Sequence, residues 1–171
     1  MTITMSRTSV PMFVQYLTAL SRLLDKAEAH AVKRQIDPQA LLSARLYPDM
    51  FPFASQVQFS CDFAKGAVAR LAGIAVPSYD DKENSFAELR GRIAKTLDFI
   101  RSVDPRKIDG SEKRAITMKF GARDLAFEGE AYLIGFAIPS MIFHVTTAFG
   151  ILRHNGVEIG KDDFLGWAPA A

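Results

Sequence analysis

Residues 10 to 31 carry apolar side chains at alternating steps of three and four, a pattern that continues for three heptads. Such spacing places the apolar side chains on one face of a long helix, and that face has to be buried against other helices. A stripe of this length is typical of an antiparallel helical bundle. Its members are Val10, Phe13, Leu17, Leu20, Leu24, Ala27 and Ala31, and the charges off the stripe are Arg22, Asp25, Lys26 and Lys33.

Two further stretches show the same helical spacing. The second helix is predicted over about residues 51 to 71 and ends at Gly73. The third is predicted over about residues 86 to 103, behind a capping box formed by Ser85 and Glu88. Their predicted inward faces are Val57, Cys61, Ala64, Val68 and Leu71, and Phe86, Leu89, Ile93, Leu97 and Ile100. The charges Arg90, Arg92, Lys95 and Arg101 predict a solvated opposite face for the third helix.

The fourth helix is predicted to begin at Pro139, which suits a first helical position, and to be closed by Asn155-Gly156. Asp37-Pro38 predicts a short additional helix that runs to about Arg45. The fourth helix is expected to turn inward Ile142, Val145, Phe149 and Leu152, and the tail is expected to fold back through Phe164, Leu165 and Trp167.

The helical period stops between Asp104 and Pro139. Residues 116 to 120 alternate, and a second apolar segment follows at residues 125 to 127. This pattern predicts a small β-hairpin inserted between the third and fourth helices. The sequence therefore predicts an all-α fold, with a four-helix bundle and a β-hairpin insert forming one domain over residues 1–171.

The composition indicates which binding partners and which cellular compartment to expect. With 21 basic and 19 acidic residues, the net charge of +2 is too small to favour nucleic acid or an anionic membrane. The single cysteine, Cys61, cannot form an internal disulfide, so a buried structural thiol in a cytoplasmic protein is expected. The start shows no signal-peptide pattern, and the most apolar stretch, residues 131 to 143, is too short to span a bilayer.

Histidines are the first candidates for chemistry, and the chain has three, His30, His144 and His154. A metal-binding pair on a helix needs ligands three or four residues apart, and no two of these histidines have that spacing. His144 is read either as a ligand or general base, or as a polar core residue bonded to a hydroxyl such as Tyr132 or Thr147.

Charged residues supply the remaining candidates. Asp62 interrupts an otherwise small and apolar helix, and it either pairs with Lys65 at the surface or points inward. An inward Asp62 would meet Arg45, Arg153 or His144. Arg153 suits the negative end of the fourth helix, and its guanidinium also suits an anion.

The fourth helix resembles a known family. Residues 143 to 148 and 151 to 156 resemble the last helix of the DinB/YfiT-like superfamily. Residues 45 to 51 and 86 to 89 look like one uncharacterised, domain-of-unknown-function branch of it, DUF1993. The resemblance implies a four-helix bundle in the DinB topology and often a homodimer.

Many members of this superfamily hold a divalent ion with three histidines, one on the second helix and two, four residues apart, on the fourth. By the resemblance, His144 occupies the place of one of that fourth-helix pair, and Ser140 the place of the other. The second helix offers Gln58, Cys61 or Asp62 where a histidine would stand. Two of the three histidines are therefore absent, and no metal cofactor is expected.

Three functions remain open. The first is a metal-free module that binds a small molecule or a partner through the polar residues Arg45, Asp62, Tyr132, His144 and Arg153. The second is a metal-dependent thiol transferase or hydrolase with an atypical site at His144, joined by Asp62. The third is a structural homodimer with a phenylalanine-rich surface. The sequence identifies neither a substrate nor a catalytic residue.

Overall fold

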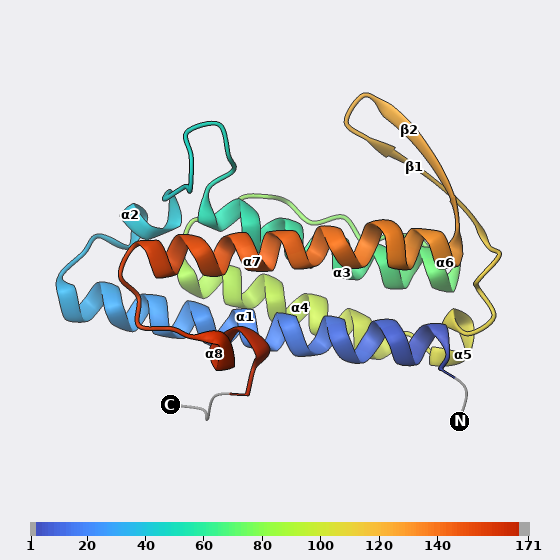
Figure 1. The fold of residues 1–171 in the computed structure, drawn as a ribbon, viewed down its shortest axis with the longest axis horizontal. Coiled ribbons are helices and arrows are strands. Elements are labelled where there is room, and N and C mark those ends of the chain that lie inside the picture. The colour runs from blue at the N-terminus through green and yellow to red at the C-terminus, as the bar shows by residue number, and fades with distance from the viewer. Residues whose placement is uncertain (1–2, 168–171) are drawn as a thin grey trace.

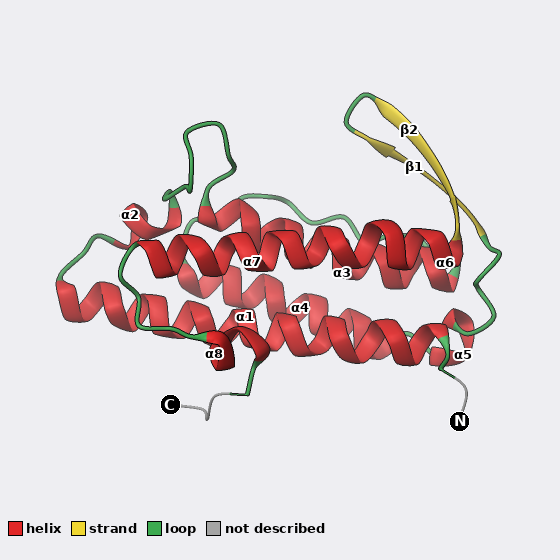
Figure 2. Ribbon diagram, viewed as in Figure 1, coloured by secondary structure: helices red, strands yellow, loops and turns green. Residues whose placement is uncertain are grey.

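The computed structural model describes residues 3–167, and within them the fold is mostly helical with one small antiparallel sheet (Figures 1 and 2). Four long helices lie side by side: α1 (Met5–Arg34), α3 (Phe53–Ala72), α4 (Phe86–Ser102), and a continuous helix formed by α6 (Gly129–Tyr132), the π-helical turn η1 (Leu133–Ala137) and α7 (Ile138–His154). The shorter elements are α2 (Pro38–Leu42), α5 (Pro105–Ile108), β1 (Ala115–Phe120), β2 (Arg123–Glu128) and α8 (Lys161–Leu165). Helix α3 packs against α4 and α7, and α1 packs against the same two helices.

Most of the apolar faces, caps and helix ends predicted from the sequence agree with the observed helices. Six of the seven stripe residues of α1, from Phe13 to Ala31, are buried. Asp37 caps α2, the Ser85 hydroxyl accepts a hydrogen bond from the Glu88 amide at the start of α4, and Gly73 ends α3 in the left-handed region. All the predicted inward residues of α3 are buried, including Cys61, because apolar periodicity and local capping specify these helices.

The prediction that the fourth helix begins at Pro139 is wrong. The helix starts ten residues earlier, at Gly129, and runs through Pro139 without a break. Proline lacks an N–H and crowds the carbonyl four residues before it, which is Gly135 here. The π-helical turn Leu133–Ala137 ends two residues before the proline and widens the helix where the ring needs space.

The continuous helix also corrects the prediction that the most apolar stretch is too short to span a bilayer. Gly129–His154 spans 26 residues with a mean hydropathy of 1.6, so by length and composition alone it is long and apolar enough to cross a membrane. Core helices of globular proteins meet the same criterion, and 33% of its most apolar window is buried. Two large apolar side chains of this helix, Ile134 and Phe143, are more than half exposed.

The predicted hairpin is confirmed between α4 and α6, with Ile116 paired opposite Phe127. The tail folds back as α8 against α1, where the Phe164 ring packs on Tyr16 and Phe149. Trp167 is 69% exposed, so its predicted return to the helices is wrong. Figure 1 shows the α2–α3 loop and the hairpin standing out on the same side of the molecule, above α3 and α7.

Candidate functional site

One face of α3 forms the floor of an aromatic cleft. Phe59, Asp62, Phe63, Gly66 and Arg70 occupy positions i, i+3, i+4, i+7 and i+11, which places them on one face of the helix. The cleft has a volume of about 450 Å³, within the range of small-molecule pockets. Its lining consists of Phe59, Asp62, Phe63 and Arg70 from α3, Phe51 from the preceding loop, Met118, Phe120 and Gly121 from the hairpin, and His144 from α7.

Ring contacts join α3, the hairpin and the fourth helix around the cleft. The imidazole of His144 stacks on the Phe63 ring, with 5.4 Å between centroids and an angle of 19°. Phe120, at the tip of the hairpin, lies 6.4 Å from Phe63 and 5.4 Å from Phe136 of η1. The hairpin is therefore held over the cleft chiefly by aromatic packing, and Phe120 remains 41% exposed.

A hydrogen-bond chain fixes which nitrogen of His144 carries the proton. The Gln56 side-chain amide donates from Nε2 to the Phe51 carbonyl at 2.9 Å, so its Oε1 is the atom that faces His144. Nδ1 of His144 lies 2.7 Å from that oxygen and therefore donates to it. In the neutral ring Nε2 then bears a lone pair, and within residues 3–167 no hydrogen-bond partner engages it.

Burial keeps this histidine neutral. Desolvation among the phenylalanine rings lowers the pKa of His144 from 6.5 to about 4. At neutral pH the ring is therefore uncharged, and its Nε2 is a hydrogen-bond acceptor.

Lowering the pH from 7 to 5 is expected to destabilise the protein through His144 by about 1 kcal/mol, after allowance for solvent at the ring edge. The unfolded state takes up the proton near pH 6.5, whereas the native ring resists it down to about pH 4, so stability falls as pH drops through that window. Urea unfolding of the protein and of His144→Gln at both pH values measures this contribution. The exposed His154→Gln is the control, and an equal pH loss in protein and His144→Gln would contradict the assignment.

Asp62 shares the cleft with His144, but its carboxylate is already engaged. It accepts hydrogen bonds from Lys65 and, at 2.7 Å, from Arg92 of α4. The Arg92 side chain is 1% exposed, which overturns the prediction that it belongs to a solvated face. Burial alone would lower the pKa of Arg92, but Asp62 and Glu83 more than offset it and raise the pKa.

Tyr132 is connected to the cleft through Arg70. The tyrosine is buried, its ring stacks on Phe136, and its hydroxyl oxygen lies 3.2 Å from NH1 of Arg70. Desolvation raises the pKa of Tyr132, although the neighbouring Arg70 cation opposes the shift. The predicted contact of His144 with Tyr132 or Thr147 is wrong, because Gln56 takes that place.

Arg45 and Arg153, two further predicted site residues, are not part of the cleft. Arg45 is exposed and donates to the Met50 carbonyl at 2.7 Å, which braces the loop before α3. Arg153 is exposed in the last turn of α7 and lies 3.4 Å from the Val157 carbonyl. Of the five predicted residues, the structure brings Asp62 and His144 together, links Tyr132 to them through Arg70, and leaves the two arginines apart.

The donors around His144 do not fit a divalent metal ion. No three His, Cys, Asp or Glu side chains within the described part of the chain are placed to hold one. Gln58 donates to Glu83, and Cys61 is buried in the core, where desolvation raises its thiol pKa to about 12. A protonated thiol and an Asp62 already held by two cations are poor ligands for a zinc-like ion.

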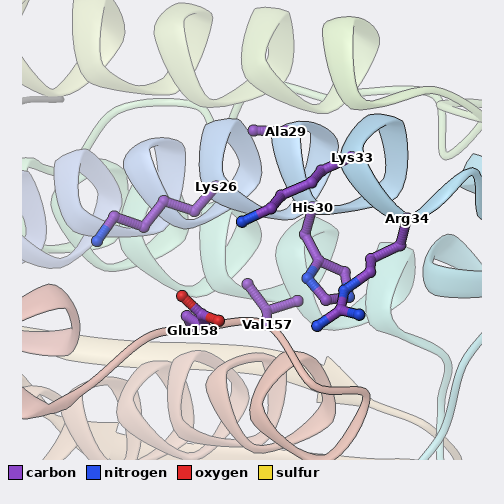
Figure 3. A pocket seen from close by; sticks show the side chains of 7 residues that line it. All are labelled: Lys26, Ala29, His30, Lys33, Arg34, Val157 and Glu158. Atoms are coloured by element: carbon purple, nitrogen blue, oxygen red, sulfur yellow. The ribbon is translucent and has the colours of Figure 1, made fainter.

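A second, smaller pocket lies at the far end of α1 (Figure 3). Its volume is about 230 Å³, and Figure 3 shows the Arg34 guanidinium beside the His30 ring, with Val157 and Glu158 across from them. None of the predicted site residues lines it. The aromatic cleft, which contains two of them, is therefore the candidate site.

Sequence reasoning missed the aromatic lining and Arg70. The row from Phe59 to Arg70 was readable as a polar and aromatic face of the second helix, opposite the small apolar face. Phe51 and Phe120 gave no such signal, because their place over α3 depends on how a loop and a hairpin pack.

The chain is similar to one described protein family and to a solved structure. Residues 5–165 match the family described as a domain of unknown function, DUF1993. A crystal structure of a DinB family member protein from Shewanella denitrificans is 40% identical, covers 97% of this chain and 94% of that chain, and superposes with a TM-score of 0.85. No curated protein matches the chain.

Proposed function

This chain belongs to the DUF1993 family, and from that membership we propose that it is a DinB-like four-helix-bundle domain that binds a small molecule without a metal ion. The aromatic cleft around His144 is the proposed site. The observation that carries the proposal is a pocket of small-molecule size whose walls are aromatic and which is lined by the neutral His144 ring, whose Nε2 has no hydrogen-bond partner within the described residues.

The lining favours a flat, largely apolar ligand. Phe59, Phe63 and Phe120 present ring faces and edges that contact aromatic groups well, and the cleft removes such groups from water. Nε2 of His144 supplies an uncharged acceptor for a ligand hydroxyl or N–H. The metal-dependent alternative at His144 and Asp62 lacks this kind of support, since the Asp62 carboxylate is neutralised by Lys65 and Arg92.

We also propose that the protein is a cytoplasmic homodimer. The resemblance to the DinB superfamily suggests the dimer, and the exposed side chains of Ile134 in η1 (55%) and Phe143 in α7 (56%) are apolar surface that a second copy would cover. Sedimentation across a concentration series tests this, and a monomer at all concentrations would refute it. The buried thiol of Cys61 suits a reducing compartment.

Binding of the neutral aromatic alcohol 2-naphthol, followed by calorimetry and fluorescence, tests the proposed site. We expect saturable binding that Phe63→Ala weakens about tenfold or more, because the ring that stacks on His144 is lost. Phe164→Ala is the matched control, since it removes the same side chain from the contact between α8 and α1. Absence of binding, or equal weakening in the two variants, would refute the cleft as a ligand site.

A further inference from the structure

Arg70 brings an uncompensated positive charge to the aromatic cleft. Its guanidinium contacts the neutral Tyr132 hydroxyl at 3.2 Å, and within the described residues no carboxylate pairs with it. A guanidinium has five N–H donors in a planar fork, so most of them remain for another acceptor. The other charged side chain that lines the cleft, Asp62, is paired with Lys65 and Arg92, and His144 is neutral at pH 7.

Gly66 gives the Arg70 side chain its position. A Cβ built on Gly66 would lie 2.5 Å from NH1 and 3.6 Å from Cζ of Arg70. The guanidinium therefore rests directly against the helix backbone, one turn toward the N-terminus, in the row that forms the cleft floor. Any larger residue at position 66 would push the charged group away from this place.

The spacing along α3 separates the two charged side chains that line the cleft. Asp62 and Arg70 are eight residues apart, roughly 12 Å along the axis at 1.5 Å per residue. Phe63, on which His144 stacks, lies between them. An anion at Arg70 is thereby kept away from the Asp62 carboxylate, while an aromatic body attached to it lies over Phe63.

We propose, on the basis of the proposed function, that the ligand class of the cleft is the aromatic monocarboxylic acids, with the carboxylate bound by Arg70 and the ring system packed on Phe63 and Phe120. The arginine fork matches the two oxygens of a carboxylate. A single unpaired cation among aromatic walls favours one negative charge over a phosphate dianion.

The test compares 2-naphthoate with 2-naphthol, which share the ring system and differ in charge. We expect the protein to bind 2-naphthoate at least about tenfold more tightly, which corresponds to about 1.4 kcal/mol. Arg70→Gln is expected to abolish this preference and to retain 2-naphthol binding, which also shows that the variant is folded. Gly66→Ala keeps the charge but displaces it, so it is expected to reduce the preference as well.

A control separates the charge of Arg70 from charge elsewhere in the protein. Arg153→Gln removes one positive charge outside the cleft and is expected to keep the preference for 2-naphthoate. Equal affinity for the two probes, or a preference that survives Arg70→Gln, would overturn this inference and leave the proposed function standing. Failure of both probes to bind would overturn the two proposals together.

Discussion

Replacing Arg92 with alanine is expected to lower the free energy of unfolding by about 3 kcal/mol or more, toward the lower end of the range for breaking buried ion pairs. The side chain is 1% exposed and joins α4 to α3 and to the loop between them. It donates to Asp62 at 2.7 Å, to Glu83 at 3.0 Å and to the Asp80 carbonyl at 3.2 Å. Its removal takes away a charged donor from each of these partly buried acceptors, although Asp62 keeps Lys65 and Glu83 keeps Gln58.

Urea unfolding followed by circular dichroism measures this loss. Arg106→Ala is the control, because Arg106 forms an ion pair with Asp104 that is exposed to solvent, and it is expected to leave stability unchanged within error. Arg92→Lys keeps the charge but not the fork, so it is expected to recover part of the loss. A loss below about 1 kcal/mol in Arg92→Ala would show that the network contributes little.

Gly129→Ala is expected to be the other strongly destabilising change, by about 1–3 kcal/mol or more. A Cβ at Gly129 would lie 2.0 Å from the carbonyl oxygen of Ser111, and backbone atoms have little freedom to give way. The same contact region holds the hydrogen bond from the Glu130 amide to the Glu112 carbonyl at 2.9 Å. The added methyl group therefore forces the start of the fourth helix away from the segment that leads into the hairpin.

Gly91→Ala is the matched control for this prediction. Gly91 lies within α4, and a Cβ there meets no atom within 4 Å, so alanine is expected to stabilise the helix by about 0.5–1 kcal/mol. Thermal and urea unfolding of both variants measures the two effects. The prediction fails if Gly129→Ala is as stable as the protein itself.

The parts of the fold that are specified locally were the predictable ones. The stripe of α1, the Asp37 and Ser85 caps and the Gly73 stop are readable because each depends on residues within a few positions of one another. The start of the fourth helix was mispredicted because Pro139 carries the same local signal at a helix start as in a helix that accommodates it by a π-helical turn. The difference between these two cases depends on tertiary packing.

The candidate site was predictable only where a residue stood out within its own helix. Asp62 and His144 did so, and they line one cleft. Arg92 was assigned to solvent because its partners Asp62 and Glu83 lie on other segments, and sequence spacing gives no information about such pairs. The prediction for Arg45 and Arg153 depended on their charge alone, and in the structure both donate hydrogen bonds to nearby backbone carbonyl groups.

The hairpin has a consequence for how this architecture diversifies. It supplies Met118, Phe120 and Gly121 to the cleft, yet among its strand residues Ile116 alone is buried to the degree of the helical core. Substitutions at its tip are therefore expected to alter the wall of the proposed ligand site at little cost to folding, whereas substitutions in α3 are expected to affect both the site and the stability. We therefore expect relatives with different binding preferences to differ mainly in the residues of the hairpin, while the residues that form the helical core stay similar.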